Sequence, residues 1–347
     1  MIPTKTEDKK DRLSLIAYRG DRAACWFYRL HAPLIHVAKN NPDFDITVSG
    51  AITKEQLEQK FDIVILQRQY KMDVLAPVLE LKKKGSKLIY EIDDNLFDIP
   101  KWNPAHKILS KKSVQAGIRR FLSEIDAIFV TTEDLQGVYN EFCEHVYVLP
   151  NSIDYTAMYE YPDNSKKPVV CWQGSLTHTK DIHIAQRGFE QIAADEDLIF
   201  KMWCGLDYKS GKPSFDIKGT EVIQLVPFEA FFQMFSQMGV TVGLAPLAAN
   251  KFNCGKSNLK FLEYTAQGAV TVASAVGPYK DTIEDGVTGL LVEDNRDWYE
   301  RVRELIDDPA YRAEILANAQ DLVQKEYNIE TNYVLWEKAI REIAGRK

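Results

Sequence analysis

Residues 245–274 read APLAANKFNCGKSNLKFLEYTAQGAVTVAS, and this stretch decides the fold. It predicts the end of one strand, a turn rich in glycine and lysine, a short helix that carries Glu263, and a second buried strand. A helix that opens on residues 255–258 directs unpaired backbone N–H groups and its positive dipole end at whatever lies above it, which favours a phosphate. The carboxylate of Glu263, two turns further on, can accept hydrogen bonds from sugar hydroxyls. The stretch therefore predicts half of a nucleotide-sugar site.

Short β-branched runs alternate with helix-length amphipathic segments on both sides of this stretch, which is the pattern of parallel βαβ units. Several runs are apolar on consecutive residues, as expected for strands covered on both faces. The predicted strands are 13–17, 46–48, 63–66, 88–92, 127–130 and 146–149 in the first half, and 169–172, 199–203, 222–225, 240–245, 270–273 and 290–292 in the second. The sequence thus predicts an α/β protein with two similar doubly wound sheets.

The 347 residues exceed one typical core and indicate two domains. We place the first, a Rossmann-like domain, at 1–152 and the second at 153–328, with a hinge in the Pro- and Asn-containing segment 150–168. A last helix, within 329–347, is expected to pack back on the first domain. Because ligands of doubly wound sheets bind beyond the carboxyl ends of the strands, we expect the active site in the cleft between the two domains.

The composition is that of an ordinary globular protein, with 45% hydrophobic and 27% charged residues and a net charge of −7. Residues 1–12 are highly charged and lack the apolar core of a signal peptide, and no apolar run approaches the roughly 18 residues that span a bilayer. We therefore expect a cytoplasmic protein. The five cysteines are widely spaced without a Cys-x-x-Cys pair, so reduced thiols are expected and a structural zinc is not.

A basic stretch, Lys101 to Arg120, contains no acidic residue. Its cations are Lys101, Lys107, Lys111, Lys112, Arg119 and Arg120. The simpler interpretation is a solvated helical face. The functional interpretation is a contact for an anionic partner such as a polyanion, a phospholipid surface or a nucleic acid.

Seven segments together resemble the family 4 type of retaining glycosyltransferases, which have the two-domain GT-B fold. In the second domain these are CWQGSLTHTKDI (171–182), VGLAPL (242–247), FNCGKSNLKFLEYTAQGAVTVASAVGPY (252–279) and EDGVTGLLV (284–292). Three segments of the first domain resemble a subgroup of this family that is common in bacteria and their phages. They are RGDRAACWFYRLHAPL (19–34), YEIDDNLFDIP (90–100) and VYVLPNSID (146–154). The resemblance implies transfer of a sugar from a UDP- or GDP-linked donor to an acceptor hydroxyl with retained configuration. It also implies that no metal or other cofactor is needed.

The resemblance assigns Glu263 to the donor ribose, as the second glutamate of the family's paired motif. A competing interpretation is an exposed helical glutamate paired with Lys260. The first glutamate of the motif, which contacts the donor sugar, would fall at Gly255, so the chain departs from the family there. Asn253, Ser257 or the Gly255 N–H would have to replace it, and a glycine at this position suits a close phosphate or a positive-φ turn.

For the diphosphate, the resemblance points to Lys180, while the arginine usually found five residues earlier is Ser175. Lys256, Arg29 or Arg19 would then supply the missing positive charge. A second interpretation of Lys180 and Lys256 is that they are solvated loop residues.

Further candidates lie at the expected carboxyl edges of the sheets. Asp93 is expected to contact the sugar or the acceptor, although Asp93 and Asp94 would also suit a turn and helix N-cap. Arg29 would contact the donor or simply pair with Asp21. His178 lies in the loop of Lys180 and is either a donor contact or incidental.

Gly174 is expected to let the diphosphate approach the backbone, and Phe228 either contacts the nucleobase or packs in the core. Asn258 and Leu259, at the start of the predicted helix, complete the expected donor site. The mechanism implied by the family is a front-face displacement in which the donor phosphate takes the acceptor's proton, so the protein positions substrates and stabilises charge.

The sequence leaves the acceptor open. A surface glycan or lipid-linked sugar is one candidate, and hydroxymethylated pyrimidine DNA of a phage, bound through the basic stretch, is a second. A non-catalytic sugar-nucleotide binder also suits the sequence, because Gly255 and Ser175 replace two expected polar groups. A GT-B phosphorylase is a further candidate, although no cofactor or phosphate site for one is identified.

Overall fold

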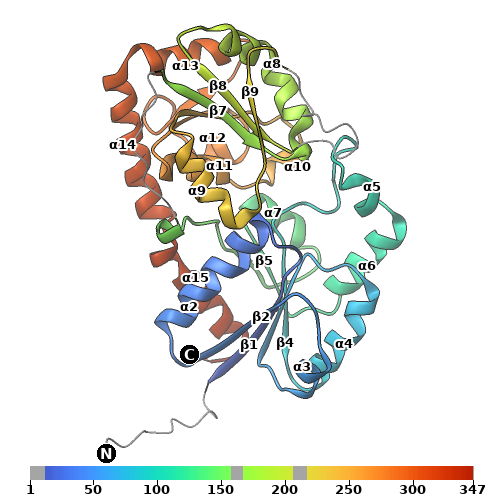
Figure 1. Ribbon diagram of the computed structural model, residues 1–347. Helices are drawn as coiled ribbons and strands as arrows, with labels where there is room; N and C mark the ends of the chain where they lie inside the picture. Colours follow the sequence, from blue (N-terminus) through green and yellow to red (C-terminus); the bar gives the residue numbers. More distant parts are fainter. Residues whose placement is uncertain (1–11, 158–166, 206–216, 347) are drawn as a thin grey trace, which may run out of the picture.

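Two six-stranded parallel sheets form the framework of the protein (Figure 1). The computed structural model describes residues 12–157, 167–205 and 217–346. The first sheet contains β1 (Leu13–Tyr18), β2 (Phe44–Ser49), β3 (Ile63–Gln67), β4 (Lys87–Glu91), β5 (Ala127–Val130) and β6 (Val146–Val148). The second contains β7 (Val169–Gly174), β8 (Ile199–Cys204), β9 (Glu221–Gln224), β10 (Val240–Ala245), β11 (Val270–Ser274) and β12 (Leu290–Val292). Each strand predicted from the sequence is present, with ends that differ by at most one or two residues, and the predicted fold class is confirmed.

The strand orders show where ligands bind. The first sheet has the order β2-β1-β3-β4-β5-β6 and the second β12-β11-β10-β7-β8-β9. The second order is that of a dinucleotide-binding Rossmann sheet. The order reverses between β1 and β3 in one sheet and between β7 and β10 in the other. Crevices beyond the carboxyl ends of these strands are the usual ligand sites of such sheets.

Helices cover both faces of the first sheet. Its helical segments are α1 (Ala24–Trp26), a π-helical turn (Phe27–His31), α2 (Ala32–Asn40), α3 (Lys54–Glu58), α4 (Met72–Lys83), α5 (His106–Leu109), α6 (Lys112–Leu122) and α7 (Glu133–Tyr139). The face with α4, α6 and α7 buries Leu75, Phe121 and Leu135 against the strands. The other face is covered by α2 and by a helix from the end of the chain.

The second sheet is sandwiched in the same way. Its helices are α8 (Thr179–Ala194), α9 (Phe231–Gln237), α10 (Lys251–Cys254), α11 (Leu259–Ala266), α12 (Pro278–Thr282), α13 (Trp298–Asp307) and α14 (Pro309–Glu326). Helices α9, α11 and α14 pack on one face, and α8 and α13 on the other. These faces bury most of the apolar side chains that the sequence places at helical spacing.

The chain crosses between the domains twice, and the two crossings are hydrogen-bonded to each other. The backbone N–H of Ile153 donates to Tyr327 O at 2.7 Å, and that of Ile329 donates to Ile153 O at 3.0 Å. After the second crossing, α15 (Ile329–Ile343) packs beside α2 on the first sheet, where Trp336 is buried. Nine residues of the predicted hinge, 158–166, lie outside the described residues.

Among the described helices, none has both the length and the apolar character needed to cross a membrane.

Candidate active site

A cavity of about 770 Å³ lies between the two domains, at the carboxyl ends of strands from both sheets. From the first domain it is lined by Arg68, which follows β3, and by Asp93 and Asp94, which follow β4. From the second it is lined by residues that follow β7 and by α11. Its volume is within the range of about 300 to 1,000 Å³ that small-molecule sites have. The cavity is therefore the expected place for a ligand held by both sheets.

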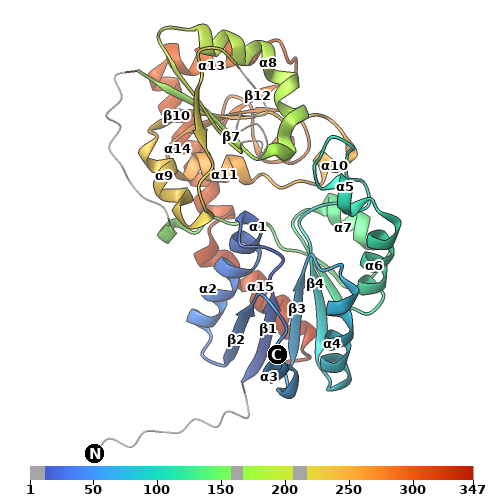
Figure 2. The ribbon, with the colours of Figure 1, turned by 45° about the vertical axis from the view of Figure 1, so that its right-hand side comes forward.

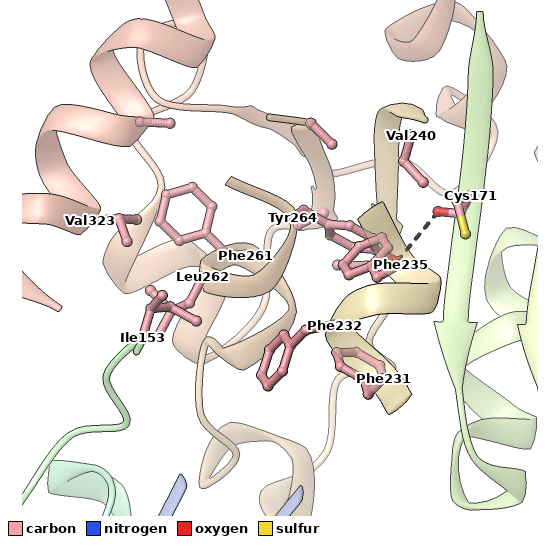
Figure 3. Close-up of a cluster of buried hydrophobic side chains, with 14 of the residues drawn as sticks. Ile153, Cys171, Phe231, Phe232, Phe235, Val240, Phe261, Leu262, Tyr264 and Val323 are labelled. Atoms are coloured by element: carbon pink, nitrogen blue, oxygen red, sulfur yellow. Dashed lines mark hydrogen bonds between the residues drawn. The ribbon is translucent and has the colours of Figure 1, made fainter. Parts of the chain in front are cut away.

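Helix α11 is anchored so that it brings Glu263 to the cavity wall. Phe261, Leu262 and Tyr264 belong to the hydrophobic cluster shown in Figure 3. The hydroxyl of Tyr264 lies 3.3 Å from Cys171 O, the contact drawn as a dashed line, and accepts a hydrogen bond from the N–H of Gln173 at 3.2 Å. The sequence provides room for the Tyr264 ring with Gly243, where a Cβ atom would lie 2.2 Å from its Cγ.

Glu263 itself is buried, with 3% of its surface exposed. Its Oε1 accepts a hydrogen bond from the hydroxyl of Tyr28 at 2.9 Å, and its Oε2 accepts one from Nε2 of Gln173 at 2.6 Å. Burial raises the pKa of Glu263 to about 7, although these hydrogen bonds and the nearby Lys260 oppose the shift. The interpretation of Glu263 as an exposed helical glutamate is therefore wrong.

Lys260 and His178 form a second polar group on the wall. Nε2 of His178 lies 3.3 Å from Nζ of Lys260, and Nδ1 lies 2.8 Å from Oδ2 of Asp181. Because an ammonium group can only donate, Nε2 accepts and the proton is assigned to Nδ1. Burial and the charge of Lys260 lower the pKa of His178 to about 4, so the ring is neutral near pH 7. Burial also lowers the pKa of Lys260 to about 8, partly offset by Glu263.

An ionic contact crosses the cavity. Nζ of Lys256, in the second domain, lies 2.9 Å from Oδ1 of Asp94 in the first. The other oxygen of Asp94 is 2.9 Å from the guanidinium of Arg68, whose Nε lies 3.5 Å from Asp93. Burial alone would lower the pKa of Lys256, but the neighbouring Asp94 carboxylate raises it. Lys256 is therefore charged, and so is Arg68.

Arg29 forms part of the cavity wall, but its guanidinium is used within the first domain. Its Nε lies 2.7 Å from Oε1 of Glu91, and its other nitrogens donate to the carbonyls of Leu149 and Val130 and to the side chain of Asn151. Arg29 and Glu91 are 1% and 0% exposed. The sequence suggested that Arg29 contacts the donor or pairs with Asp21. It did not predict the buried ion pair of Arg29 with Glu91.

The cavity brings together nine of the predicted site residues. They are Arg29, Asp93, Ser175, His178, Phe228, Lys256, Ser257, Leu259 and Glu263. Phe228 both lines the cavity and packs in the core, since its ring stacks on Phe231 at 5.3 Å between centroids. The donor contacts predicted for these residues stay predictions, except that the guanidinium of Arg29 already has its partners within the first domain.

Four other predicted residues lie behind the wall and position it. The side-chain amide of Asn253 donates to Oδ1 of Asp181 at 2.9 Å, and that of Asn258 donates to Thr282 at 3.1 Å. Gly255 has φ −75°, so the expected positive-φ turn is wrong, and its carbonyl accepts a hydrogen bond from Thr132 at 3.2 Å. Gly174 ends β7, and a Cβ there would lie 2.7 Å from the Trp172 ring.

Lys180 is an exposed residue of the first turn of α8 and does not line the cavity. The structure instead presents Lys256 and Lys260 on the wall. The helix that carries Glu263 begins later than predicted, because residues 255–258, on which it was expected to open, join α10 to α11, which begins at Leu259 with Asn258 as its N-cap.

Sequence reasoning missed Tyr28 and Arg68, and it considered Lys260 only as a partner of Glu263. Arg68 carried a usable signal, because it lies two residues beyond the predicted strand 63–66, much as Asp93 directly follows the predicted strand 88–92. Its φ of +52° is unusual for a residue with a side chain and is typical of functional sites. Tyr28 carried no such signal, because only the packing of the two domains brings it to Glu263.

Comparisons with known proteins find glycosyltransferases that share this architecture. The model of a glycosyl transferase-like family matches residues 184–337. The structure superposes on sucrose-phosphate synthase from Thermosynechococcus elongatus with a TM-score of 0.70 and 13% identity, covering 96% of this chain and 100% of that one. The chain has the GT-B fold.

Two further GT-B structures are similar along their whole length. HepE from Anabaena, in complex with UDP and glucose, has a TM-score of 0.68 and 12% identity, covering 95% of this chain and 100% of that one. A glycosyltransferase from Rickettsia africae has a TM-score of 0.68 and 10% identity, covering 97% and 100%. A search of curated proteins finds no match to the sequence. The predicted GT-B fold is therefore confirmed, and residues 184–337 are similar to the glycosyl transferase-like family.

Proposed function

We propose that the protein is a retaining, metal-independent glycosyltransferase that moves a sugar from a nucleotide diphosphate to an acceptor hydroxyl. The observation that carries the proposal is the Glu263 carboxylate beside two lysines on the wall of an interdomain cavity. A carboxylate can accept hydrogen bonds from both ribose hydroxyls, and ammonium groups compensate a diphosphate. A similar structure, HepE from Anabaena with UDP-glucose bound, favours UDP as the nucleotide.

Three charged side chains of the wall, Lys256, Lys260 and Asp93, have proposed roles in this reaction. Lys256 and Lys260 stabilise the charge that develops on the departing diphosphate, in place of Lys180 and of the arginine that Ser175 replaces. Asp93, on the first domain, faces the side from which an acceptor hydroxyl approaches. The donor phosphate takes the acceptor's proton, so no enzyme nucleophile is required and the protein acts by positioning.

The proposal is tested by incubating the protein with UDP- and GDP-sugars in the presence of EDTA and measuring release of the nucleotide diphosphate. We expect release with at least one donor, and an increase of the thermal midpoint by the same donor. A donor that raises the midpoint but never turns over, even with acceptor glycans and hydroxymethylated DNA supplied, would indicate a non-catalytic binder. Turnover that EDTA abolishes and Mg²⁺ restores would contradict metal independence.

The affinity for a nucleotide sugar is expected to rise between about pH 6 and pH 7, and to fall again above about pH 8, where Lys260, whose pKa burial lowers to about 8, loses its charge. Binding to ribose hydroxyls needs the carboxylate form of Glu263, whose pKa burial raises to about 7. Donor binding therefore lowers this pKa, and affinity is lost as the pH falls through it. The measurement is a series of titrations with a UDP-sugar, whose diphosphate diester does not titrate in this range. In Glu263→Gln this part of the pH dependence should disappear, and an unchanged profile would exclude Glu263 as its source.

The basic stretch favours one particular second candidate, transfer to hydroxymethylated pyrimidines in DNA. Lys101, Lys107, Lys111 and Lys112 are exposed on and before α5 and α6, and Asn103 and Ala105 of the same stretch line the cavity. A polyanion held by these lysines would therefore reach the reaction centre. Arg120 instead pairs with Glu124, and Arg119 lies over the Phe97 ring at 4.6 Å.

A salt titration separates the two acceptor classes. If DNA is the acceptor, its affinity should fall with a log–log slope of about −0.9 for each phosphate contacted. A Lys111→Ala/Lys112→Ala variant should then have a slope shallower by about two contacts. A neutral glycan acceptor would bind with little salt dependence in both proteins, and that result would contradict the DNA candidate.

A further inference from the structure

Two of the ligand-facing groups of the second domain, Glu263 and Lys256, already have a partner from the first domain. The hydroxyl of Tyr28 donates to Glu263 at 2.9 Å, and the carboxylate of Asp94 lies 2.9 Å from Nζ of Lys256. Tyr28 is 2% exposed, so the first contact is shielded from water. The two contacts cross the cavity in which we propose that a donor binds.

The chemistry of these partners matches that of a donor. A tyrosine hydroxyl offers a carboxylate the same O–H donor as a ribose hydroxyl, and a carboxylate offers an ammonium group the same anionic oxygens as a phosphate. We propose that Tyr28 and Asp94 hold the places of the donor ribose and diphosphate in the free protein, and that the donor displaces both. This inference rests on the proposed function and names the residues that set its donor affinity.

The remaining contacts of each group make such an exchange feasible. Gln173, which belongs to the same domain as Glu263, holds Oε2 and leaves Oε1 for the exchange. When Lys256 turns to a diphosphate, Asp94 keeps Arg68 as a partner at 2.9 Å, so no buried charge is left alone. When the donor binds, Glu263 and Lys256 therefore each lose one contact to the first domain and gain an equivalent contact to the donor.

The local backbone of Tyr28 is also suited to movement. Tyr28 lies in the π-helical turn Phe27–His31, a conformation that is rare and frequent at functional sites. Its ring contacts Phe228 and Phe232 edge-on, with centroids 5.9 and 6.4 Å apart. These contacts are apolar and tolerate a shift of the hydroxyl better than a second hydrogen bond would.

If the two residues compete with the donor, removing them should strengthen nucleotide binding. A group that binds a site intramolecularly lowers the apparent affinity of any ligand for that site. Residues that only position Glu263 and Lys256 would have the opposite effect, because their loss would weaken binding. The sign of the change therefore decides between the two roles.

The test compares Tyr28→Phe and Asp94→Asn with the unmodified protein by calorimetric titration at pH 8, where Glu263 is largely ionised. The probes are UDP and uridine, and GDP and guanosine. Tyr28→Phe should bind both the nucleoside and its diphosphate about three- to tenfold more tightly, and Asp94→Asn only the diphosphate. Gln173→Leu serves as the matched control and should weaken both, since Gln173 positions Glu263 from its own domain.

If Tyr28→Phe binds the nucleoside and its diphosphate no more tightly than the unmodified protein does, Tyr28 does not compete with the donor. If Asp94→Asn gains as much affinity for uridine as for UDP, Asp94 does not compete with the diphosphate. If neither the unmodified protein nor the variants bind any of the four probes, the proposed function fails as well. Binding by the variants alone supports the inference. Thermal unfolding of each variant confirms that it is folded before titration.

Discussion

Glu263→Gln is expected to lower kcat/KM for the nucleotide sugar by about tenfold to a hundredfold. The carboxylate would make charge-assisted hydrogen bonds to ribose, and such bonds contribute about 1.5–3 kcal/mol. The amide keeps the size of the side chain and one acceptor oxygen, but it loses the charge. The measurement is steady-state release of the nucleotide diphosphate, with donor affinity determined separately.

The fold of this variant should not suffer, which makes the result interpretable. Burial disfavours the charged form of Glu263 and raises its pKa to about 7, so a neutral side chain is at least as compatible with this position. The matched control is Glu229→Gln, because Glu229 is a carboxylate that also lines the cavity but is exposed. Equal losses in both variants would show that general electrostatics, and not a contact of Glu263, is responsible.

Arg29→Met is expected to reduce the free energy of unfolding by about 3–5 kcal/mol, because it leaves the fully buried Glu91 without its ion partner. The guanidinium also donates hydrogen bonds to the carbonyls of Leu149 and Val130, at the ends of β6 and β5. The substitution removes these hydrogen bonds, which connect the two strand ends. Urea unfolding measures the change. A loss below about 1 kcal/mol would mean that the pair contributes little.

The destabilisation of Arg29→Met should be larger at pH 8 than at pH 5. Burial raises the pKa of Glu91 to about 7 even beside Arg29, and removing the cation raises it further. A carboxyl whose folded pKa lies above its unfolded value costs stability as the pH rises from the unfolded pKa toward the folded one. The double variant Arg29→Met/Glu91→Leu should regain part of the loss and show less of this pH dependence.

The fold could be predicted because its strands are covered on both faces. Parallel strands of this kind are continuous apolar runs, and runs such as 63–66 and 127–130 have no competing interpretation at that length. The positions of the helices followed from the same alternation. The strand order, by contrast, depends on which crossovers pack, and no local pattern in the sequence determines that.

The site could be predicted where a residue's role follows from its place after a strand or on α11. Glu263, Asp93 and His178 belong to this group and line the cavity. Lys180 was placed by matching a family motif, and the path of the chain from β7 into α8 leaves it exposed. Tyr28 comes from the other domain, so its contact with Glu263 depends on how two separately folded sheets meet. No local sequence pattern predicts a contact between side chains of two different domains.

The two chain crossings have a mechanical consequence. Ile153 is bonded to both Tyr327 and Ile329, so the two connections act as one pivot between the sheets. Helices α5 and α10 lie on the other side of the domain interface from these crossings (Figure 2). Rotation of the domains about this pivot would therefore have to expose Phe252 of α10, which is buried in the hydrophobic cluster of the first domain.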